Sequence, residues 1–193
     1  MRLSLSLCLA VVALSTPLSS ATADTAATVA TAATGTRLVA IEGMSATVMQ
    51  EGQSSFSGLA LRARFHSGRF IEGVEFMPAV EWWRNNSTVE SFGIRSTRRD
   101  ATMALDARYN FKHEGFAPYA GAGFAIHFLT NEVDAPSFGL NDAQSSVIKG
   151  GVAALGGITF PLSGRLTNFF ELKYHHVTDF RQLKLNWGLA YAL

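Results

Sequence analysis

The sequence predicts an all-β fold, an eight-stranded antiparallel up-and-down transmembrane β-barrel, and three observations lead to it. Residues 181–193 alternate without a break, since every odd position from Leu183 to Leu193 is apolar and every even one is polar or small. A period of two residues is typical of a β-strand, whose successive side chains point to opposite faces. Hydrophobic residues make up 48% of the chain, yet no apolar run of 18 residues occurs, so alternation disperses them. The face opposite the apolar one carries charges of both signs among glycine and alanine, which suits a narrow interior better than a soluble exterior.

Seven further alternating segments precede this closing strand. The first is the weakest, with Val39 and Ile41 on one face and Glu42 opposite. The second places Leu61 against Arg62. All but the first are long enough to cross a membrane with tilt, which takes roughly 9–11 residues. The seven expected strands are residues 37–48, 55–66, 70–83, 99–111, 116–129, 145–160 and 165–177.

The middle and late segments repeat the same division into two faces. The third sets Trp82 against Glu81, and the fourth is the cleanest, with alternating apolar residues from Met103 to Phe111. The fifth and sixth have glycine on the face opposite their apolar residues, and the seventh sets Leu172 against charged neighbours. Each segment therefore fits one strand of the same barrel.

The connections alternate between short and long. Turns of about four residues follow the second, fourth and sixth segments, whereas residues 84–98 and 130–144 form long polar links that we expect to be loops. An up-and-down outer-membrane barrel has tight turns on one side and long loops on the other. An even number of strands places both ends of the barrel on the tight-turn side, which we expect to be periplasmic.

The charged residues opposite the apolar face are expected to form ion pairs inside the barrel. They are five acids and six bases, so their charges nearly cancel. An eight-stranded barrel is only wide enough for its own side chains, and breaking a buried ion pair costs ~3–5 kcal/mol. We therefore expect a plugged lumen and keep a narrow channel as an alternative. The expected interior residues are Glu42, Arg62, Arg64, Glu75, Glu81, Asp106, Arg108, Lys149, Glu171, Lys173 and Lys184.

The N-terminal residues 1–23 have the pattern of a cleaved signal peptide. Arg2 precedes an apolar run that is too short to span a membrane, and Ala21 and Ala23 provide a small-x-small cleavage site. Cys8, the only cysteine, lies in this segment, so the mature chain has no disulfide, which suits a Gram-negative envelope. Removing the segment leaves 15 basic and 15 acidic residues, a balance that argues against nucleic acid as a partner. We expect residues 24–36 to be a flexible Ala/Thr leader and 37–193 to be the barrel.

Three motifs carry a resemblance to a known group. They are FAPYAGAG at 116–123, FELKYHH at 170–176 and WGLAYAL at 187–193. Through them the chain resembles the small eight-stranded outer-membrane proteins, namely the OmpA-type membrane domain and the opacity-protein and attachment-invasion group. The resemblance covers roughly residues 37–193. It implies an integral protein of the bacterial outer membrane, which we expect to be a monomer.

The residues give little support to an enzyme or a metal protein. His175 and His176 are adjacent, so their rings point to opposite faces of a strand, and the other histidines stand alone in the sequence. We expect no metal and no cofactor. Some small outer-membrane barrels are lipid A deacylases with a lipid-facing His-x-Ser pair, and His176 and Thr178 resemble that spacing. No third orienting group is evident, so a deacylase-like hydrolase is the alternative and a non-enzymatic barrel is the main expectation.

The long links carry the candidate recognition residues. Arginine dominates the first link, whereas the second has three acids and no base. Guanidinium groups bind phosphates in bidentate fashion, so we expect contacts with lipopolysaccharide, and a host or envelope protein as a partner through residues 84–98 and 130–144. The overall expectation is a structural or surface-interaction role. The arginines are Arg84, Arg95, Arg98 and Arg99.

Overall fold

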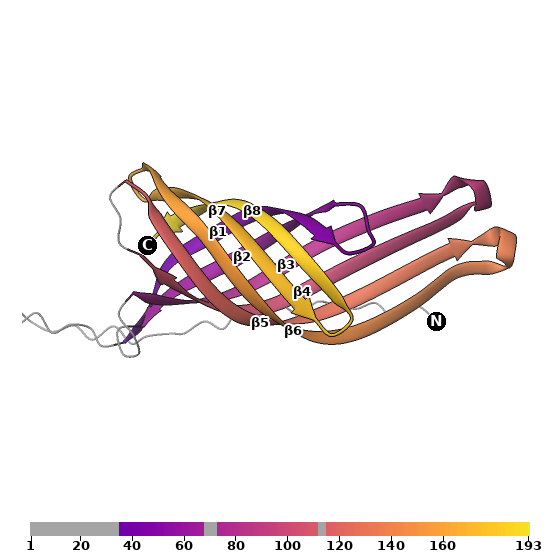
Figure 1. Ribbon diagram of the computed structural model, residues 1–193, viewed down its shortest axis with the longest axis horizontal. Helices are drawn as coiled ribbons and strands as arrows, with labels where there is room; N and C mark the ends of the chain where they lie inside the picture. Colours follow the sequence, from indigo (N-terminus) through magenta and orange to yellow (C-terminus); the bar gives the residue numbers. More distant parts are fainter. Residues whose placement is uncertain (1–34, 68–72, 112–114) are drawn as a thin grey trace, which may run out of the picture. The chain divides into compact units, whose positions relative to one another are not determined.

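The computed structural model describes residues 35–67, 73–111 and 115–193. These residues form a closed barrel in which each strand pairs antiparallel with the next and β8 closes on β1 (Figure 1). The predicted eight-stranded antiparallel up-and-down barrel is thus confirmed. The strands are β1 (Thr36–Gln50), β2 (Phe56–Ser67), β3 (Val74–Val89), β4 (Ile94–Asn110), β5 (Ala117–Ala135), β6 (Leu140–Ser163), β7 (Leu166–Val177) and β8 (Phe180–Ala192).

Several expectations fall outside the described residues. They are the signal peptide at 1–23, nearly all of the leader at 24–36, the start of the third expected strand at 70–72, and most of the short turn after the fourth. Within the described part, the only helical elements are the two short 3-10 turns η1 (Glu90–Phe92) and η2 (Pro136–Phe138). No helix in that part is long and apolar enough to cross a membrane.

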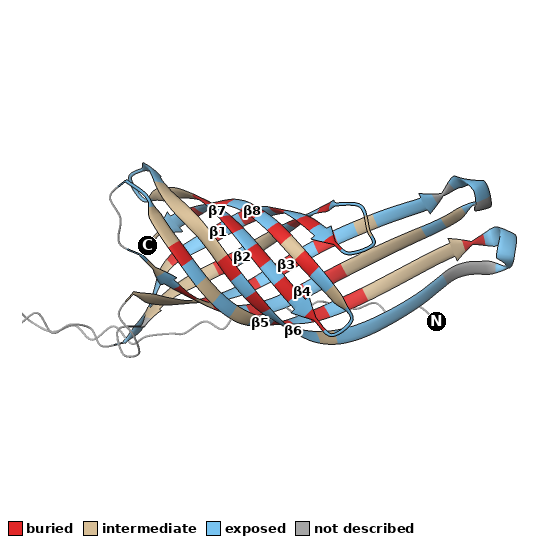
Figure 2. Cartoon of the chain, viewed as in Figure 1, coloured by how far each residue is buried: buried red, intermediate tan, exposed pale blue. Residues whose placement is uncertain are grey.

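Buried and exposed residues alternate along much of the closed part, as over residues 40–50 of β1 and 77–83 of β3 (Figure 2). In β8 the side chains of Lys184 and Asn186 are buried, whereas the alternating apolar residues Leu185 and Trp187 are exposed. The large apolar residues therefore point outward and many polar ones inward. This is the reverse of a soluble barrel, whose apolar residues fill the interior.

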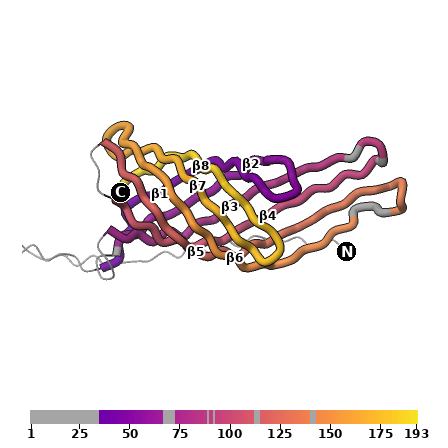
Figure 3. The backbone as a smooth tube through the Cα atoms, viewed as in Figure 1, coloured from indigo at the N-terminus to yellow at the C-terminus, as the bar shows by residue number. Residues whose placement is uncertain are grey.

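The expected loops at 84–98 and 130–144 are wrong, because both segments continue as β-hairpins. β3 and β4 stay in register from Val74 opposite Tyr109 to Val89 opposite Ile94, and η1 makes the turn. β5 and β6 continue in the same way around η2. Figure 3 shows the two hairpins running side by side beyond the closed barrel.

The two hairpins are joined, since Arg95 of β4 lies opposite Asp134 of β5. Strands β3 to β6 therefore extend past the barrel as one four-stranded sheet. The sequence pattern did not predict this extension, because a sheet that is exposed to solvent on both faces does not alternate between apolar and polar residues.

Glycine in β5 and β6 makes room for large neighbours on the inner face. A Cβ atom added at Gly123 would collide with the Asp106 side chain, and one at Gly157 would collide with the Tyr119 ring. These glycines let two backbones pass beside a buried carboxylate and a buried phenol. The sequence pattern of small residues opposite an apolar face thus has a steric cause.

Candidate functional site

A buried arginine lies at the centre of the polar interior. The Nε atom of Arg62 donates to Glu42 at 2.6 Å, and its Nη1 atom donates to Glu171 at 2.9 Å. Glu171 also accepts hydrogen bonds from Tyr119 and Asn186. The guanidinium and both carboxylates are shielded from solvent, so each charge is balanced by a partner and not by water.

A second group lies beside it on β3, β4, β7 and β8. The ammonium of Lys173 contacts Glu81 at 2.9 Å and Asp106 at 2.7 Å. Lys184 donates to the other oxygen of Glu81. Two lysines and two acids from four strands therefore form a chain of alternating sign.

A third group lies nearer the short-turn end. Arg64 contacts Glu42 at 3.1 Å and Glu75 at 3.4 Å. Arg108 contacts Glu75 at 3.1 Å and lies over the ring of Tyr119, with its Cζ atom 4.3 Å from the centroid. Glu42 thus connects this group to the central arginine.

The structure brings ten of the eleven predicted interior residues into these three groups. Lys149 is the exception. It is partly exposed and pairs with Asp179 in the link between β7 and β8, so it lies at the rim.

A buried histidine pair was missed by the sequence reading. His127 appears isolated in the sequence, but its Nδ1 atom lies 2.7 Å from the acceptor oxygen Oδ2 of Asp100, and its Nε2 atom lies 3.4 Å from Nδ1 of His175. Thr102 contacts the same Nδ1 atom at 2.9 Å. Asp100, Thr102 and His127 share the inward parity of their strands, but only the barrel closure brings His175 of β7 next to β5.

An apolar layer closes the interior toward the hairpins. Phe56 and Trp83 stack with their centroids 4.5 Å apart, and Val48 and Leu129 pack beside them. Phe180 covers the same cluster. Toward the hairpins, the described interior thus carries ion pairs, then the histidine pair, then aromatic and aliphatic side chains.

The hydrolase candidates lie at the hairpin end of the barrel. His176 and Thr178 are both exposed and line one small pocket of about 300 Å³ together with Glu51. Asp179, the next acid in the chain, pairs with Lys149. Nothing in the described part of the structure joins His176 to Thr178 or to a carboxylate by a hydrogen bond.

The four candidate arginines do not form one cluster. Arg98 points to the inner face of the hairpin sheet, where its Nε atom donates to Asn131 at 2.9 Å. Arg84, Arg95 and Arg99 have the outward parity of β3 and β4, and Arg84 lies directly opposite Arg99 in the register. Arg99 also forms an ion pair with Glu132 of β5 at 3.0 Å.

Metal-binding groups of three or more histidine, cysteine, aspartate or glutamate side chains are absent from the described ranges. His127 instead contacts Asp100 through Nδ1 and His175 through Nε2, so both of its ring nitrogens are engaged by protein side chains.

Comparison with known proteins gives structural matches alone. No protein-family model matches the chain, and no curated protein matches it by sequence. Neisserial surface protein A (NspA) is 15% identical with a TM-score of 0.63, and the match covers 82% of this chain and 99% of that one. Ail, the attachment invasion locus protein of Yersinia pestis, is 15% identical with a TM-score of 0.55 and the same coverage. The N-terminal β-barrel domain of Pseudomonas aeruginosa OprF is 15% identical with a TM-score of 0.52, over 80% of this chain and 97% of that one.

These likenesses define the class of fold. The chain has the fold of the small eight-stranded outer-membrane β-barrels. The resemblance read from the three sequence motifs is thereby confirmed at the level of the fold.

The buried carboxylate of Glu171 provides a test of the interior network. We expect Glu171→Gln to lower the free energy of unfolding by ~3 kcal/mol, because it leaves Arg62 without one of its two buried counter-charges. Urea titration of the protein refolded into phospholipid vesicles measures the change. The matched control is Glu132→Gln, which removes the exposed ion pair with Arg99 and should cost under about 1 kcal/mol. Equal effects of the two substitutions would contradict a coupled interior.

Proposed function

We propose that the protein is a non-enzymatic, integral protein of the bacterial outer membrane with a plugged lumen and a structural or surface-interaction role. The single observation that carries this proposal is the sidedness of the barrel. Its outer face is an apolar belt with few charges, while ten charged side chains pair with one another inside. Ions are stable in that interior because each has a partner, and apolar side chains are stable on the outside when lipid surrounds them.

Every strand of the barrel contributes exposed apolar side chains to the outer belt. Leu59, Met103, Phe124 and Ile148 are more than half exposed although they are apolar. In water such a belt would be far larger than the few hundred Å² of contiguous apolar surface that soluble monomers expose. Aromatic residues gather toward its two margins, as in the interfacial girdles of membrane barrels. They include Trp82, Phe111, Phe128, Phe160, Tyr174 and Tyr191.

The filled interior favours a plug over a narrow channel. Water or ions crossing the barrel would have to displace the aromatic layer of Phe56 and Trp83 and then break the buried ion pairs of Arg62 or Lys173. Breaking such pairs costs several kcal/mol each. The role then lies in the belt and the hairpins and not in transport.

The outward arginines of β3 and β4 are placed to meet lipopolysaccharide phosphates. Arg84 is the first outward residue beyond Trp82, so it lies at the margin of the apolar belt. Arg84 and Arg99 are directly opposite one another, and only Arg99 has a carboxylate partner, Glu132, among the described residues, so an anion beside Arg84 would reduce the repulsion between the two. Arg95 lies farther along the same face. The hairpin sheet around them is also the surface we propose for a host or envelope protein.

The three tryptophans of the chain test the sidedness. Trp82 and Trp187 are 50% and 52% exposed on the belt, whereas Trp83 is 1% exposed inside the barrel. We expect brominated phospholipids to quench the fluorescence of a variant that keeps only Trp82 or only Trp187, because bromine quenches on contact. The variant that keeps only Trp83 should be quenched little.

Replacing each removed tryptophan by Phe preserves the apolar surface in all three variants. The Trp83-only variant is the internal control, since Trp83 adjoins Trp82 in the same strand. A folded protein in which Trp83 is quenched and Trp82 is not would invert the proposed sidedness, and the outer-membrane role with it.

The outward arginines give a second test. We expect the triple variant Arg84→Gln, Arg95→Gln, Arg99→Gln to bind lipopolysaccharide about tenfold more weakly, with a reduced salt dependence, because three charge-assisted contacts are lost at a solvated surface. Binding to purified lipopolysaccharide at increasing salt measures this. The control is Arg37→Gln with Arg165→Gln, which removes charge at the short-turn end. Unchanged binding of the triple variant would exclude the phosphate contacts.

The alternative, a lipid A deacylase-like hydrolase, rests on the pocket that His176 and Thr178 share with Glu51. Incubation with lipopolysaccharide followed by mass spectrometry of released fatty acid separates it from the main proposal. We expect no release above the level of His176→Ala, because an imidazole without an orienting partner is a weak general base. Release that the His176→Ala substitution abolishes would replace the non-enzymatic role.

A further inference from the structure

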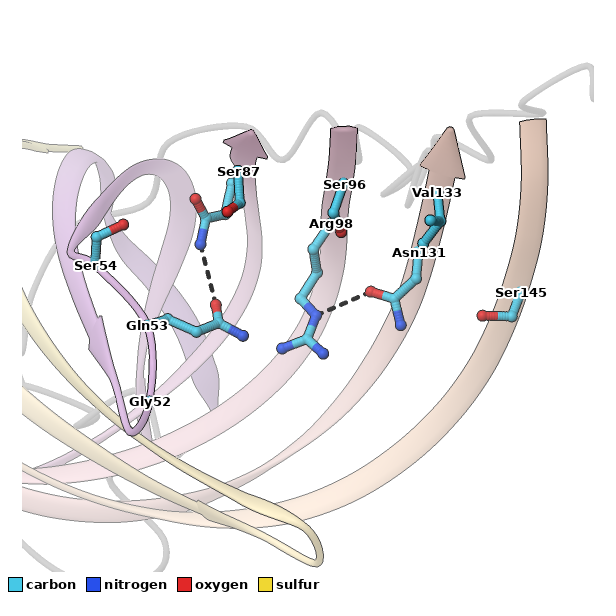
Figure 4. A pocket seen from close by; sticks show the side chains of 10 residues that line it. Gly52, Gln53, Ser54, Ser87, Ser96, Arg98, Asn131, Val133 and Ser145 are labelled. Carbon is cyan, nitrogen blue, oxygen red and sulfur yellow. Dashed lines mark hydrogen bonds between the residues drawn. The ribbon is translucent and has the colours of Figure 1, made fainter. Parts of the chain in front are cut away.

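A polar pocket lies on the inner face of the four-stranded hairpin sheet, outside the filled barrel. Its volume is about 510 Å³. The extended parts of β3 to β6 form one wall, and the link between β1 and β2 forms the other (Figure 4). The lining residues are Gly52, Gln53, Ser54, Asn85, Ser87, Ser96, Arg98, Asn131, Val133 and Ser145.

One row of side chains crosses the whole sheet in register. Asn85 lies opposite Arg98, Arg98 opposite Asn131, and Asn131 opposite Ser145. Neighbouring strands are ~4.8 Å apart, so the row spans about 14 Å. Two amides, a hydroxyl and a guanidinium therefore face the pocket at one level.

Arg98 is the only charged residue among those that line this pocket. Its Nε atom is engaged by Asn131 at 2.9 Å, which fixes the plane of the guanidinium. In Figure 4 the terminal nitrogens of Arg98 lie between Gln53 and Asn131. Within the described chain Arg98 has no carboxylate partner in an ion pair, so its terminal edge is free for a bidentate contact with an anion.

The opposite wall is held in place by the sheet. Asn85 donates through Nδ2 to the Oε1 atom of Gln53 at 3.0 Å. This contact ties the β1–β2 link to β3 and orients the Gln53 amide toward the row. The pocket is thus formed before any ligand arrives, which reduces the ordering cost of binding.

We propose that this pocket binds a sugar unit that carries one carboxylate. The carboxylate would accept hydrogen bonds from the terminal nitrogens of Arg98. The hydroxyls of the sugar ring would form hydrogen bonds with the amides and hydroxyls of the lining, which are those of Gln53, Asn85, Asn131, Ser87, Ser96 and Ser145. Amides and hydroxyls both donate and accept, as sugar hydroxyls do. A single guanidinium matches one negative charge, and a polyanion would leave further charges without partners. This inference goes beyond the proposed function, since it concerns the inner and not the outer face of the hairpins.

The test uses the full chain in detergent micelles and ligand-detected NMR titration. Glucuronate is the probe, with glucose as the sugar without the acid and acetate as the acid without the sugar. We expect glucuronate to saturate one site, and glucose and acetate to bind at least about tenfold more weakly, since each lacks one set of hydrogen bonds. A 3-deoxy-ulosonate is titrated in parallel. Whichever acid sugar binds more tightly indicates whether the source is a uronate polysaccharide or the ulosonate class.

Two substitutions in the pocket provide the decisive comparison. Arg98→Gln should weaken glucuronate binding about 10- to 100-fold through loss of a charged hydrogen-bonding partner. Asn131→Asp, which is nearly isosteric, should weaken it similarly, because the new carboxylate would pair with Arg98. Arg165→Gln, with the same change of charge at the other end of the barrel, should have no effect. Absence of saturable binding by either acid sugar, equal binding of acetate and glucuronate, or an unchanged affinity of a folded Arg98→Gln protein would overturn the proposal.

Discussion

The need to pair every charge inside a narrow closed barrel governs the rest of this structure. Arg62 contacts carboxylates of β1 and β7, and Lys173 contacts carboxylates of β3 and β4. The contacts of Arg62 with Glu171 and of Lys173 with Glu81 and Asp106 link strands that are not neighbours in the sheet, so they act across the lumen where backbone hydrogen bonds do not. Removing one partner would leave a buried charge at a cost of several kcal/mol. The network therefore favours one register of closure over its alternatives.

The same constraint explains where small residues occur. Gly123 and Gly157 leave space for the side chains of Asp106 and Tyr119, and no room remains for a Cβ atom at either position. The outer face has no such limit, because its side chains do not meet across a narrow lumen. The exposed large apolar residues, such as Phe124 and Trp187, lie on that face, whereas Trp83 and Phe169 are buried inside. The division into a crowded polar interior and an apolar exterior follows from packing and solvation together.

Beyond the closed barrel, side chains no longer face one another across a narrow lumen, and the types of polar residue change. The extension of β3 to β6 is wet on both faces, so neutral amides and hydroxyls replace ion pairs. Arg98 has no carboxylate partner among the residues the structure describes, in contrast to Arg62. Arg84 and Arg99 lie side by side on the outer face, and Arg99 forms an ion pair with Glu132 of β5.

The sequence alone determined the number of strands, their alternation and most of the residues that face inward within the closed barrel, because period-two patterning is a local property that a one-residue shift would invert. It placed Glu42, Arg62 and Glu171 on one face of their strands without showing that they meet. Which inward residues touch depends on the stagger of the closed sheet. Only the tertiary structure therefore shows that His127 contacts His175 and that Lys149 lies apart from the central ion pairs. The hairpin extensions were also evident only in the tertiary structure, because strands that are polar on both faces show no alternation in the sequence. Pairing with neighbouring strands shows that Arg98 faces inward, whereas the outward-facing arginines are Arg84, Arg95 and Arg99.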